Sequence, residues 1–354
     1  MTITGANTRV DLATALQKEL SEVIQFKLAE RLDSNRVGLL DVLYAYRLFL
    51  GRWPEFDSID SLTAKIGSND VQSFALGFVT SPEFKTRFPQ ASEALDMVVM
   101  REMADGTHLH FNLADLQSLR ISTGLHELPI QEGMLRVLRP GMNCVDAGAH
   151  IGMYSLLMGR TVRPPVARWW RGGGGGKVYS FEPFPRTWPL LLRNINANHL
   201  QNTVVATNAA CHAHPGRGRM FKNPHDPGNL GEVFVRAGAS GDATGTAEVD
   251  LVRVDDVVPS YVRIGLVKID IEGSEPAAME GMQRILHRDR PIIFTEFNPG
   301  ALESIGDMTA AEYLGFLEEA GYRCREVDNF LLDNATEYEY QEGDKTTNLV
   351  CEPK

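Results

Sequence analysis

The sequence predicts an α/β protein with a mainly parallel sheet, preceded by an all-helical N-terminal region. From residue 141 onward, short runs rich in Val, Ile and Leu alternate with segments of helical periodicity, which is typical of a parallel sheet covered on both faces. The first of these runs ends in Asp146, and a glycine-spaced turn, Gly148 to Gly152, then opens a helix. A buried strand that leads into a glycine turn and a helix is typical of nucleotide sites in α/β folds.

Length and composition limit the number of domains and the kinds of partner that we expect. The 354 residues exceed what one compact domain usually needs, so we expect two units. The net charge of −11 weighs against nucleic acid as the main partner, and no apolar run approaches the roughly 20 residues of a membrane helix. The polar segment 1–9 lacks the apolar core of a signal peptide. The four scattered cysteines fit a reducing cytoplasm, not a disulfide framework or a zinc site: Cys144, Cys211, Cys324 and Cys351.

The first part of the chain, residues 1–90, reads as a helical domain. Leucine and isoleucine recur at near-helical spacing over 11–32, and the pattern continues over 39–50. The string from Tyr44 to Glu55, followed by Phe78 to Phe84, resembles a small bacterial helical domain that recurs beside surface-associated and sugar-modifying proteins. This resemblance implies no chemistry, and we expect its aromatic residues to pack in a core. The helices are candidates for a homodimer contact.

Residues 91–140 are expected to link this domain to the second one, 141–354, and to approach its cofactor site. They contain an edge strand at 108–111 and a helix at 129–138. The remaining strands are expected at 142–146, 177–182, 203–208, 249–254, 265–270, 291–296, 322–327 and 347–352. Helices are expected at 152–160, 187–198, 275–287 and 309–320. Two segments interrupt the alternation, a flexible Gly-rich insertion at 163–176 and a long hairpin or lid at 214–246.

The acid that precedes the glycine turn indicates the charge of the ligand. Asp146 would repel the pyrophosphate of a dinucleotide and would attract a ligand with a sulfonium and an ammonium group, which points to S-adenosylmethionine (SAM). A dinucleotide-binding dehydrogenase also needs three glycines at G-x-G-x-x-G spacing. Gly148 and Gly152 stand four positions apart without a third glycine to complete that pattern.

Four further carboxylates lie at or just beyond the ends of predicted strands. Glu182 ends the second strand, where an acid can accept hydrogen bonds from ribose hydroxyls. Asp270, with Glu272 just beyond it, follows the strand that carries Lys268, and Glu296 ends the next strand. Because parallel sheets bind ligands at these ends, we expect Asp270 and Glu272 to be functional. Lys268 can instead serve only as an ion-pair partner, and Glu296 can be a solvated strand end.

The order of these motifs resembles the FkbM-type SAM-dependent methyltransferases over about residues 120–330. The resemblance is carried by Asp-Ala-Gly-Ala-His-Ile-Gly, Phe-Glu-Pro, Asn208-Ala209-Ala210, Lys-Ile-Asp-Ile-Glu-Gly-Ser-Glu and Glu296-Phe297-Asn298. It implies a Rossmann-like, seven-stranded methyltransferase sheet and O-methylation of a hydroxyl on a sugar, glycan or glycosylated natural product. By position, Asp146, Gly148 and Gly152 would hold the methionine end, Glu182 the ribose, and Asn208 and Ala209 the adenine. The family often has Asn where this chain has His150, which we include among the cofactor-binding residues.

The reaction requires a base, because an alcohol is a poor nucleophile until its proton leaves. Asp270 or Glu272 is the preferred base, with Lys268 and Glu296 beside them, and His150 and His212 are held in reserve. Mg²⁺ could be held by Asp270, Glu296 and Asn298, which offer hard oxygen ligands on neighbouring strand ends. The pairs His108/His110 and His212/His214 are more typical of surface residues than of a zinc site.

Two other functions are kept open. One is a binding or scaffold protein whose methyltransferase-like half is inactive, which the presence of all four site acids disfavours. The other is a dehydrogenase, which the glycine spacing disfavours. The acceptor is expected to be a small molecule or a glycan.

Overall fold

The computed structural model describes residues 98–103, 105–112, 115–122, 126–163, 175–222, 233–237 and 247–354. The expectations for the helical region 1–90, including its dimer contact, lie outside these residues. Most of the Gly-rich insertion at 163–176 lies outside them as well.

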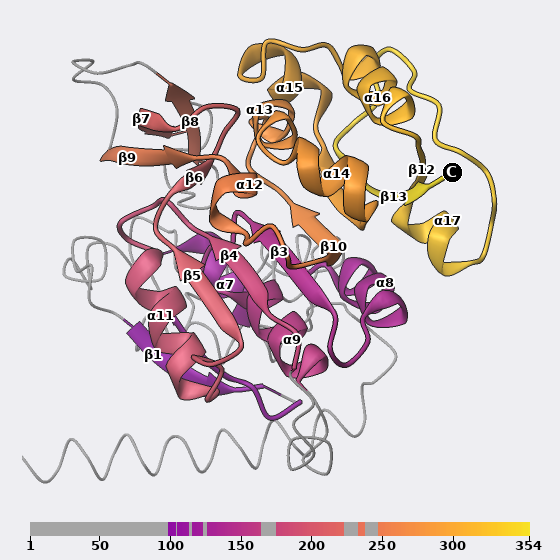
Figure 1. Ribbon diagram of the computed structural model, residues 1–354. Coiled ribbons are helices and arrows are strands. Elements are labelled where there is room, and N and C mark those ends of the chain that lie inside the picture. Colours follow the sequence, from indigo (N-terminus) through magenta and orange to yellow (C-terminus); the bar gives the residue numbers. More distant parts are fainter. Residues whose placement is uncertain are drawn as a thin grey trace, which may run out of the picture. The chain divides into compact units, whose positions relative to one another are not determined.

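A seven-stranded sheet forms the centre of the described unit (Figure 1). The strand order across the sheet is β12-β13-β11-β10-β3-β4-β5, and β13 alone is antiparallel to its neighbours. The strands are β3 (Asn143–Ala147), β4 (Val178–Phe181), β5 (Val204–Thr207), β10 (Ile264–Ile269), β11 (Ile292–Phe297), β12 (Tyr322–Glu326) and β13 (Thr347–Pro353). Each lies within a residue or two of an expected strand.

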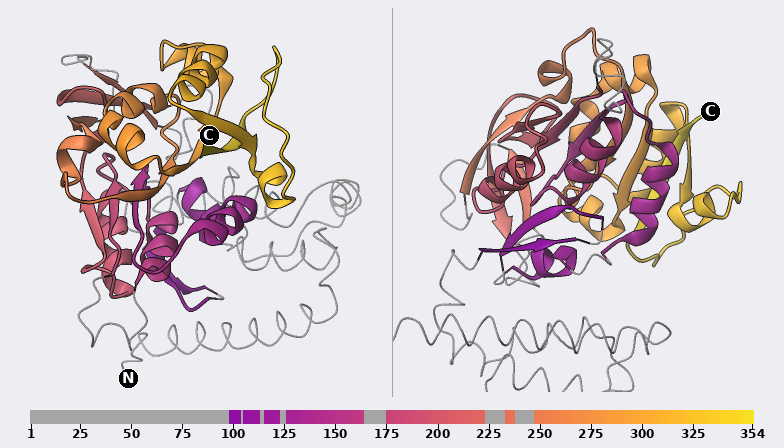
Figure 2. Two further views of the ribbon diagram at one scale, coloured as in Figure 1. Left: turned by 45° about the vertical axis from the view of Figure 1, so that its right-hand side comes forward. Right: turned by 90° about the horizontal axis from the view of Figure 1, so that it is seen from below.

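Helices cover both faces of this sheet, as the alternation of strands and helices predicts (Figures 1 and 2). Successive strand residues point to opposite faces. Cys144 and Leu266 therefore pack on one side, and Val145 and Val267 pack on the other. The first side is covered by α8 (Leu128–Val137), α9 (Met153–Val162), α11 (Trp188–Ala197) and α17 (Val327–Leu331). The second is covered by α12 (Val254–Val257), α13 (Glu275–Glu280), α14 (Gln283–Asp289), α15 (Pro299–Ser304) and α16 (Ala310–Glu319).

A second, four-stranded sheet has the order β6-β9-β7-β8. It consists of β6 (Ala210–Cys211), β7 (Gly216–Lys222), β8 (Val233–Ala237) and β9 (Ala247–Val252). The antiparallel pair β7–β8 confirms a hairpin within 214–246. The run 249–254, expected among the strands of the parallel sheet, is a correction, because β9 pairs with β6 and β7 instead. Its alternating burial, unlike the continuous burial of β4, reflects a strand with one exposed face.

Residues 98–138 also belong to this unit where they are described. An antiparallel pair, β1 (Val98–Glu102) and β2 (His108–Asn112), confirms the expected strand at 108–111. The short helix α7 (Leu116–Ser122) follows it. The helix expected at 129–138 is α8, whose Ile130 and Met134 are buried in the same core as Leu266 of the sheet. The domain boundaries themselves stay predictions.

The single helix expected at 275–287 is two helices, α13 and α14. The chain turns at Gly281, where a Cβ atom would lie 2.1 Å from the backbone oxygen of His212. The second helix is capped from outside, because the Asp255 carboxylate accepts the backbone N–H groups of Arg284 (2.7 Å) and Ile285 (3.3 Å). Helical periodicity continues across this break, so the sequence pattern alone does not reveal it.

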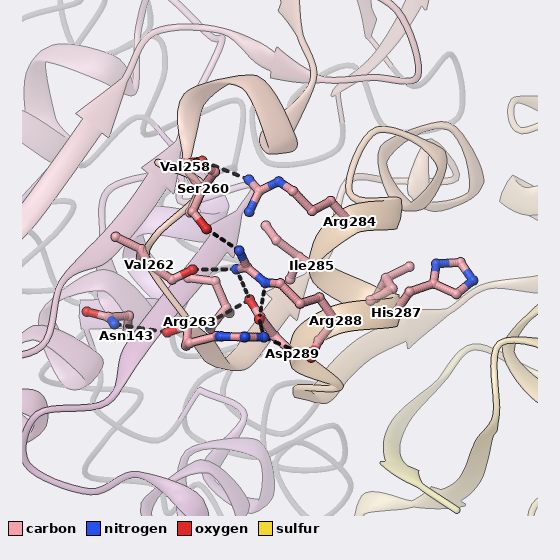
Figure 3. A network of polar contacts seen from close by, with 12 residues as sticks. Asn143, Val258, Ser260, Val262, Arg263, Arg284, Ile285, His287, Arg288 and Asp289 are labelled. Carbon is pink, nitrogen blue, oxygen red and sulfur yellow. Dashed lines mark hydrogen bonds and ion pairs between the residues drawn. The ribbon is translucent and has the colours of Figure 1, made fainter.

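A polar network ties the end of α14 to the segment that enters β10 (Figure 3). The Asp289 side chain has no exposed surface and accepts hydrogen bonds from Arg288 Nε (2.6 Å), Arg263 Nη1 (3.0 Å) and the backbone N–H of Ile264 (3.0 Å). Burial alone would raise the pKa of Asp289, but these donors outweigh it and the pKa is lowered. The network therefore fixes the start of the strand whose other end reaches Asp270.

All four cysteines are buried and free. The scattered positions in the sequence do not reveal that two of the cysteines are neighbours. Cys324 of β12 and Cys351 of β13 lie opposite each other, with their sulfur atoms 2.7 Å apart. None of the helices in the described ranges combines the length and apolarity that crossing a bilayer demands.

Candidate functional site

An open cavity lies at the carboxyl ends of β3, β4 and β10, with about 960 Å³ of empty space, part of it continuous with solvent. This is the edge at which parallel sheets bind ligands. Eight residues singled out in the sequence line it: Gly148, His150, Glu182, Ala209, His212, Lys268, Asp270 and Glu272. Five others do not: Asp146, Gly152, Asn208, Glu296 and Asn298.

The glycine turn after β3 is locked to its neighbours by backbone contacts. Gly148 has φ +82°, and a Cβ atom there would lie 2.0 Å from the carbonyl oxygen of Asp270. The backbone N–H groups of Gly148 and Ala149 both donate to the Phe181 carbonyl, at 3.1 and 3.0 Å. Because these donors have acceptors within the protein, the turn does not offer the row of free N–H groups that a pyrophosphate needs.

Glu182 at the end of β4 is held by a set of hydrogen bonds. One carboxylate oxygen accepts from the backbone N–H of Phe184 (2.7 Å) and the hydroxyl of Thr187 (2.8 Å). The other accepts from the backbone N–H of His150 (2.7 Å). A carboxylate has about four acceptor positions, so one stays available for a ligand hydroxyl in the cavity that Glu182 lines.

Asp146 occupies a different place from the one expected. It is fully buried at the end of β3, where its Oδ2 accepts from Ser155 Oγ (2.5 Å) and its Oδ1 has no hydrogen-bond partner. It stands between Lys268 of β10 and Ser180 of β4 in the sheet register. The geometry does not support a direct contact of Asp146 with a ligand, and its charge acts through Ser155 and Lys268.

Lys268 and Asp270 form a buried ion pair beside the cavity. Lys268 Nζ lies 3.1 Å from Asp270 Oδ2 and 4.8 Å from the ring centroid of Tyr154. Burial alone would lower the pKa of Lys268, but Asp270, Asp146 and Glu127 raise it above its ordinary value. The lysine is therefore cationic, and it fixes one oxygen of the Asp270 carboxylate.

The carboxylates of Asp270, Glu272 and Glu296 converge. One oxygen from each lies within 4.8 Å of the others, and among the described residues this is the group of three or more acids, histidines or cysteines with the spacing of a metal site. Burial and the neighbouring negative charges raise the pKa of Glu296 well above its usual value. Its Oε2 has no hydrogen-bond partner. Such a group either retains a proton or binds a cation, and the three converging carboxylates offer ligands for the second.

Two residues near this group have structural roles. Asn298, expected as a metal ligand, is the N-cap of α15, and its side-chain oxygen accepts the N–H of Ala301 (3.1 Å). The place expected for Asn298 in the ligand set is taken by Glu272. Glu275 closes the loop after β10 by accepting the N–H of Ile271 (2.8 Å), and burial raises the pKa of Glu275 to about 7.

The opposite end of the cavity is apolar. Phe184, Ala210 and Met220 are buried there in one cluster with strand residues of the four-stranded sheet, and they line the cavity beside Ala209. Asn208 is exposed and donates its side-chain N–H to the Glu182 carbonyl (2.7 Å), so it contacts the backbone of Glu182 instead of lining the cavity.

Sequence reasoning missed several lining or supporting residues. Tyr154 donates its hydroxyl to Glu127 (2.6 Å), and both line the cavity. Asp115 approaches His150, with its Oδ2 3.3 Å from His150 Nε2. One signal was available, because an aspartate three positions before Ser118 at a helix start is typical of an N-cap, and Asp115 does accept the Ser118 N–H (3.1 Å).

The last strand of the chain, β13, is inserted antiparallel between β11 and β12 of the sheet. This sheet order is that of the Rossmann-like methyltransferase class. The cavity at its strand ends, with an apolar end, a ribose-type acid and a cluster of carboxylates, fits that class. The model of the methyltransferase FkbM domain matches residues 146–324, half of the chain. The chain therefore belongs to the FkbM methyltransferase family.

Two fungal relatives are similar over part of their length. Methyltransferase sdnD of Sordaria araneosa is 31% identical over 164 residues, which cover 39% of this chain and 59% of that protein. Methyltransferase 1 of Beauveria bassiana is 27% identical over 154 residues, covering 39% of this chain and 57% of that protein. The match therefore spans less than two thirds of each of these relatives.

Solved structures give only distant likenesses. The FkbM methyltransferase of Methylobacillus flagellatus is 16% identical, with a TM-score of 0.35, covering 75% of this chain and 59% of that one. A Streptococcus mutans protein solved in complex with SAH is 10% identical, with a TM-score of 0.38, covering 65% of this chain and 100% of that one.

Proposed function

We propose that the protein is a SAM-dependent O-methyltransferase that methylates a hydroxyl of a sugar, a glycan or a glycosylated natural product. One observation carries the proposal. A single cavity contains both Glu182, a ribose-type acid beside an apolar end, and the Asp270 and Glu272 carboxylates, which can accept a proton. Family membership supports methyl transfer, and the carboxylate-rich part of the cavity supports a hydroxyl acceptor.

The residues present fit SAM on three counts. The apolar end beside Ala209 suits an adenine, Glu182 has an acceptor position for a ribose hydroxyl, and the surplus of carboxylates suits a cationic ligand. The glycine-turn donors that a pyrophosphate would need are bonded to Phe181. When bound, SAM supplies an activated methyl group on a sulfonium.

The chain's own residues would position and deprotonate the acceptor. Asp270, fixed at Oδ2 by Lys268, and Glu272, on the loop that follows, are the two base candidates. Positioning the acceptor hydroxyl next to the methyl donor can supply most of the rate gain, because the donor needs no further activation. His150 and His212 also line the cavity and stay alternative bases.

A divalent cation is part of the proposal, held by Asp270, Glu272 and Glu296. The convergence of these three carboxylates and the unpartnered Glu296 Oε2 support it. Hard oxygen ligands of this kind suit Mg²⁺.

A cytoplasmic location also stays a proposal, which the four free, buried cysteines support.

A screen of glycoside and other hydroxylated acceptors with methyl-labelled SAM tests this function. We expect label transfer to an acceptor oxygen, lost after EDTA treatment and restored by Mg²⁺. If EDTA leaves the transfer unchanged, the proposed cation site is refuted, but the proposed methyltransferase activity stands. SAM binding without transfer to any acceptor would favour the inactive binding or scaffold protein.

A further inference from the structure

Carboxylates dominate the charge of the cavity. Glu127, Glu182, Asp270 and Glu272 all line it, and the described lining contains no arginine. A ligand such as SAM carries one carboxylate beside its two cationic groups. That carboxylate would be repelled by this lining unless a cationic group of the protein receives it.

Most cationic or titratable nitrogen groups of the lining are already engaged. Lys268 is bound to Asp270. His126 Nε2 lies 3.5 Å from a Glu127 oxygen and 3.1 Å from the side-chain nitrogen of Gln117. His212 Nδ1 accepts the backbone N–H of His214 at 3.2 Å, next to the apolar end of the cavity. The fourth group of this kind in the described lining is His150, whose ion-pair partner, Asp115, lies outside that lining.

The His150 ring is held in a fixed place. Its backbone, at φ +51°, lies in the glycine turn, and its N–H donates to Glu182. On its side chain, Nε2 lies at the ion-pair distance of 3.3 Å from the buried Asp115 carboxylate, and neither Nε2 nor the buried Nδ1 has a hydrogen-bond partner. A buried ring nitrogen with no partner requires an explanation, and a ligand group that accepts its proton provides one.

Asp115 is itself positioned by the helix that it caps. It accepts the N–H groups of Gln117 (3.3 Å) and Ser118 (3.1 Å) at the start of α7, and the Ser118 hydroxyl also contacts it. The charges of Asp115, Glu182 and Lys268 act on the His150 ring. Burial and Lys268 oppose a charge on it, but Asp115 and Glu182 outweigh them, and the pKa of His150 is raised.

We propose that the His150 imidazolium, held by Asp115, receives the carboxylate of the methionine part of SAM. His150 is the binding residue, and Asp115 is a positioning residue that orients the ring and keeps it protonated. This inference rests on the proposed function. It assigns the pair a role in donor recognition, which differs from the role of a reserve base.

Calorimetric titrations of SAM and of decarboxylated SAM test the proposal, because the second ligand lacks only the carboxylate. For the wild-type protein we expect the second ligand to bind about tenfold more weakly or worse, the cost of a lost charge-assisted hydrogen bond. His150→Ala should weaken SAM by a similar factor and leave the decarboxylated ligand unchanged. The matched control is His287→Ala, an exposed histidine on α14, which should alter neither affinity.

A second variant tests the positioning residue. In the wild-type protein, SAM affinity should fall as the pH rises through the raised pKa of His150, because the ring loses its charge. Asp115→Asn should move this fall to lower pH, while the affinity for the decarboxylated ligand shows no such fall in either protein. A purely structural role for Asp115 would weaken both ligands without moving the pH profile.

Three results would overturn the inference. Equal losses of both ligands in His150→Ala would make the ring a structural element. Unchanged affinities with a lower turnover would make it a base. Failure of the wild-type protein to bind either ligand would overturn the proposed function together with the inference.

Discussion

Gly148 shows how a single missing side chain shapes the site. The turn that follows β3 passes so close to the Asp270 carbonyl that only hydrogen fits in place of a Cβ, and its φ of +82° is one that other residues rarely adopt. From the sequence, Gly148 is expected to be required because it contacts the ligand. The structure adds the contact with the end of β10, which links the donor side of the cavity to Asp270.

Replacing this glycine should therefore damage the site. We expect Gly148→Ala to lower the melting temperature and to weaken SAM binding by more than about tenfold, because strain of order 1–3 kcal/mol is added to a backbone clash. Thermal melts and calorimetry measure both. The control is Gly315→Ala inside α16, where a Cβ meets no atom within 4 Å and where alanine should stabilise the helix by about 0.5–1 kcal/mol. A Gly148→Ala protein with unchanged melting and affinity would refute this reading of the turn.

The base is tested at the same scale. Asp270→Asn and Glu272→Gln keep the shape of the side chain and remove its ability to accept the acceptor proton. We expect the variant that lacks the base to lose about 10²–10⁴-fold in kcat and to keep its calorimetric affinity for SAM. The other variant serves as the comparison, with both assayed at saturating Mg²⁺ because each carboxylate is also a proposed cation ligand. If both retain full kcat, neither carboxylate is the base, and His212 becomes the next candidate.

At the scale of the elements, α14 and the segment before β10 form one rigid part (Figure 3). Asp289 joins them through Arg288, Arg263 and the backbone of Ile264. Since β10 carries Lys268 near its other end, the network contributes to placing the site without touching it. The network stabilises the fold, and substitutions in it should leave the catalytic activity unchanged.

Asp289→Asn should cost about 1.5–3 kcal/mol of unfolding free energy, because hydrogen bonds to a buried charge are lost. The folded pKa of Asp289 is lowered, so its stabilisation is present above the unfolded pKa and is lost as the pH falls through the folded value. The difference between wild type and variant in denaturant unfolding should therefore shrink below about pH 4. The exposed Asp333→Asn is the control, with little effect at any pH. A difference that stays constant down to pH 2 would contradict this role for the charge.

Elements with a clear period were predictable, and breaks within a pattern were not. Most of the sheet strands follow from apolar runs, such as the one that ends at Ile269, whereas β12 alternates apolar and charged residues. The place of β9 depends on pairing with β7, which no local pattern records. The division between α13 and α14 depends on the close approach of Gly281 to His212, a contact between distant parts of the chain.

In the site too, features that follow from the sequence pattern were predictable, and features that depend on contacts between distant residues were not. Strand-end acids such as Glu182 and Asp270 were predictable because parallel strands deliver their carboxyl ends to one edge. The direction of Asp146, which faces Ser155 of α9, could not be read from its position at a strand end. Tyr154 of α9 lines the cavity and Asp115, which caps α7, reaches His150, and both positions depend on tertiary packing.

At the scale of the whole molecule, the described unit combines a methyltransferase sheet with a cavity suited to a cationic adenosine. The glycine-turn donors are bonded internally, the lining is rich in carboxylates, and one end is apolar. The first two features distinguish SAM from NAD, which carries a pyrophosphate and has no sulfonium or ammonium group, whereas the apolar end suits the adenine that both ligands carry. Identification of the donor is the central claim on which the reaction and the role of His150 both depend.

Calorimetric titration of the full chain with SAM and, in parallel, with NAD tests this claim most directly. We predict saturable binding of SAM with one site per chain and no heat of binding with NAD under the same conditions. Binding of NAD, or no binding of SAM by a protein that melts cooperatively, would contradict it.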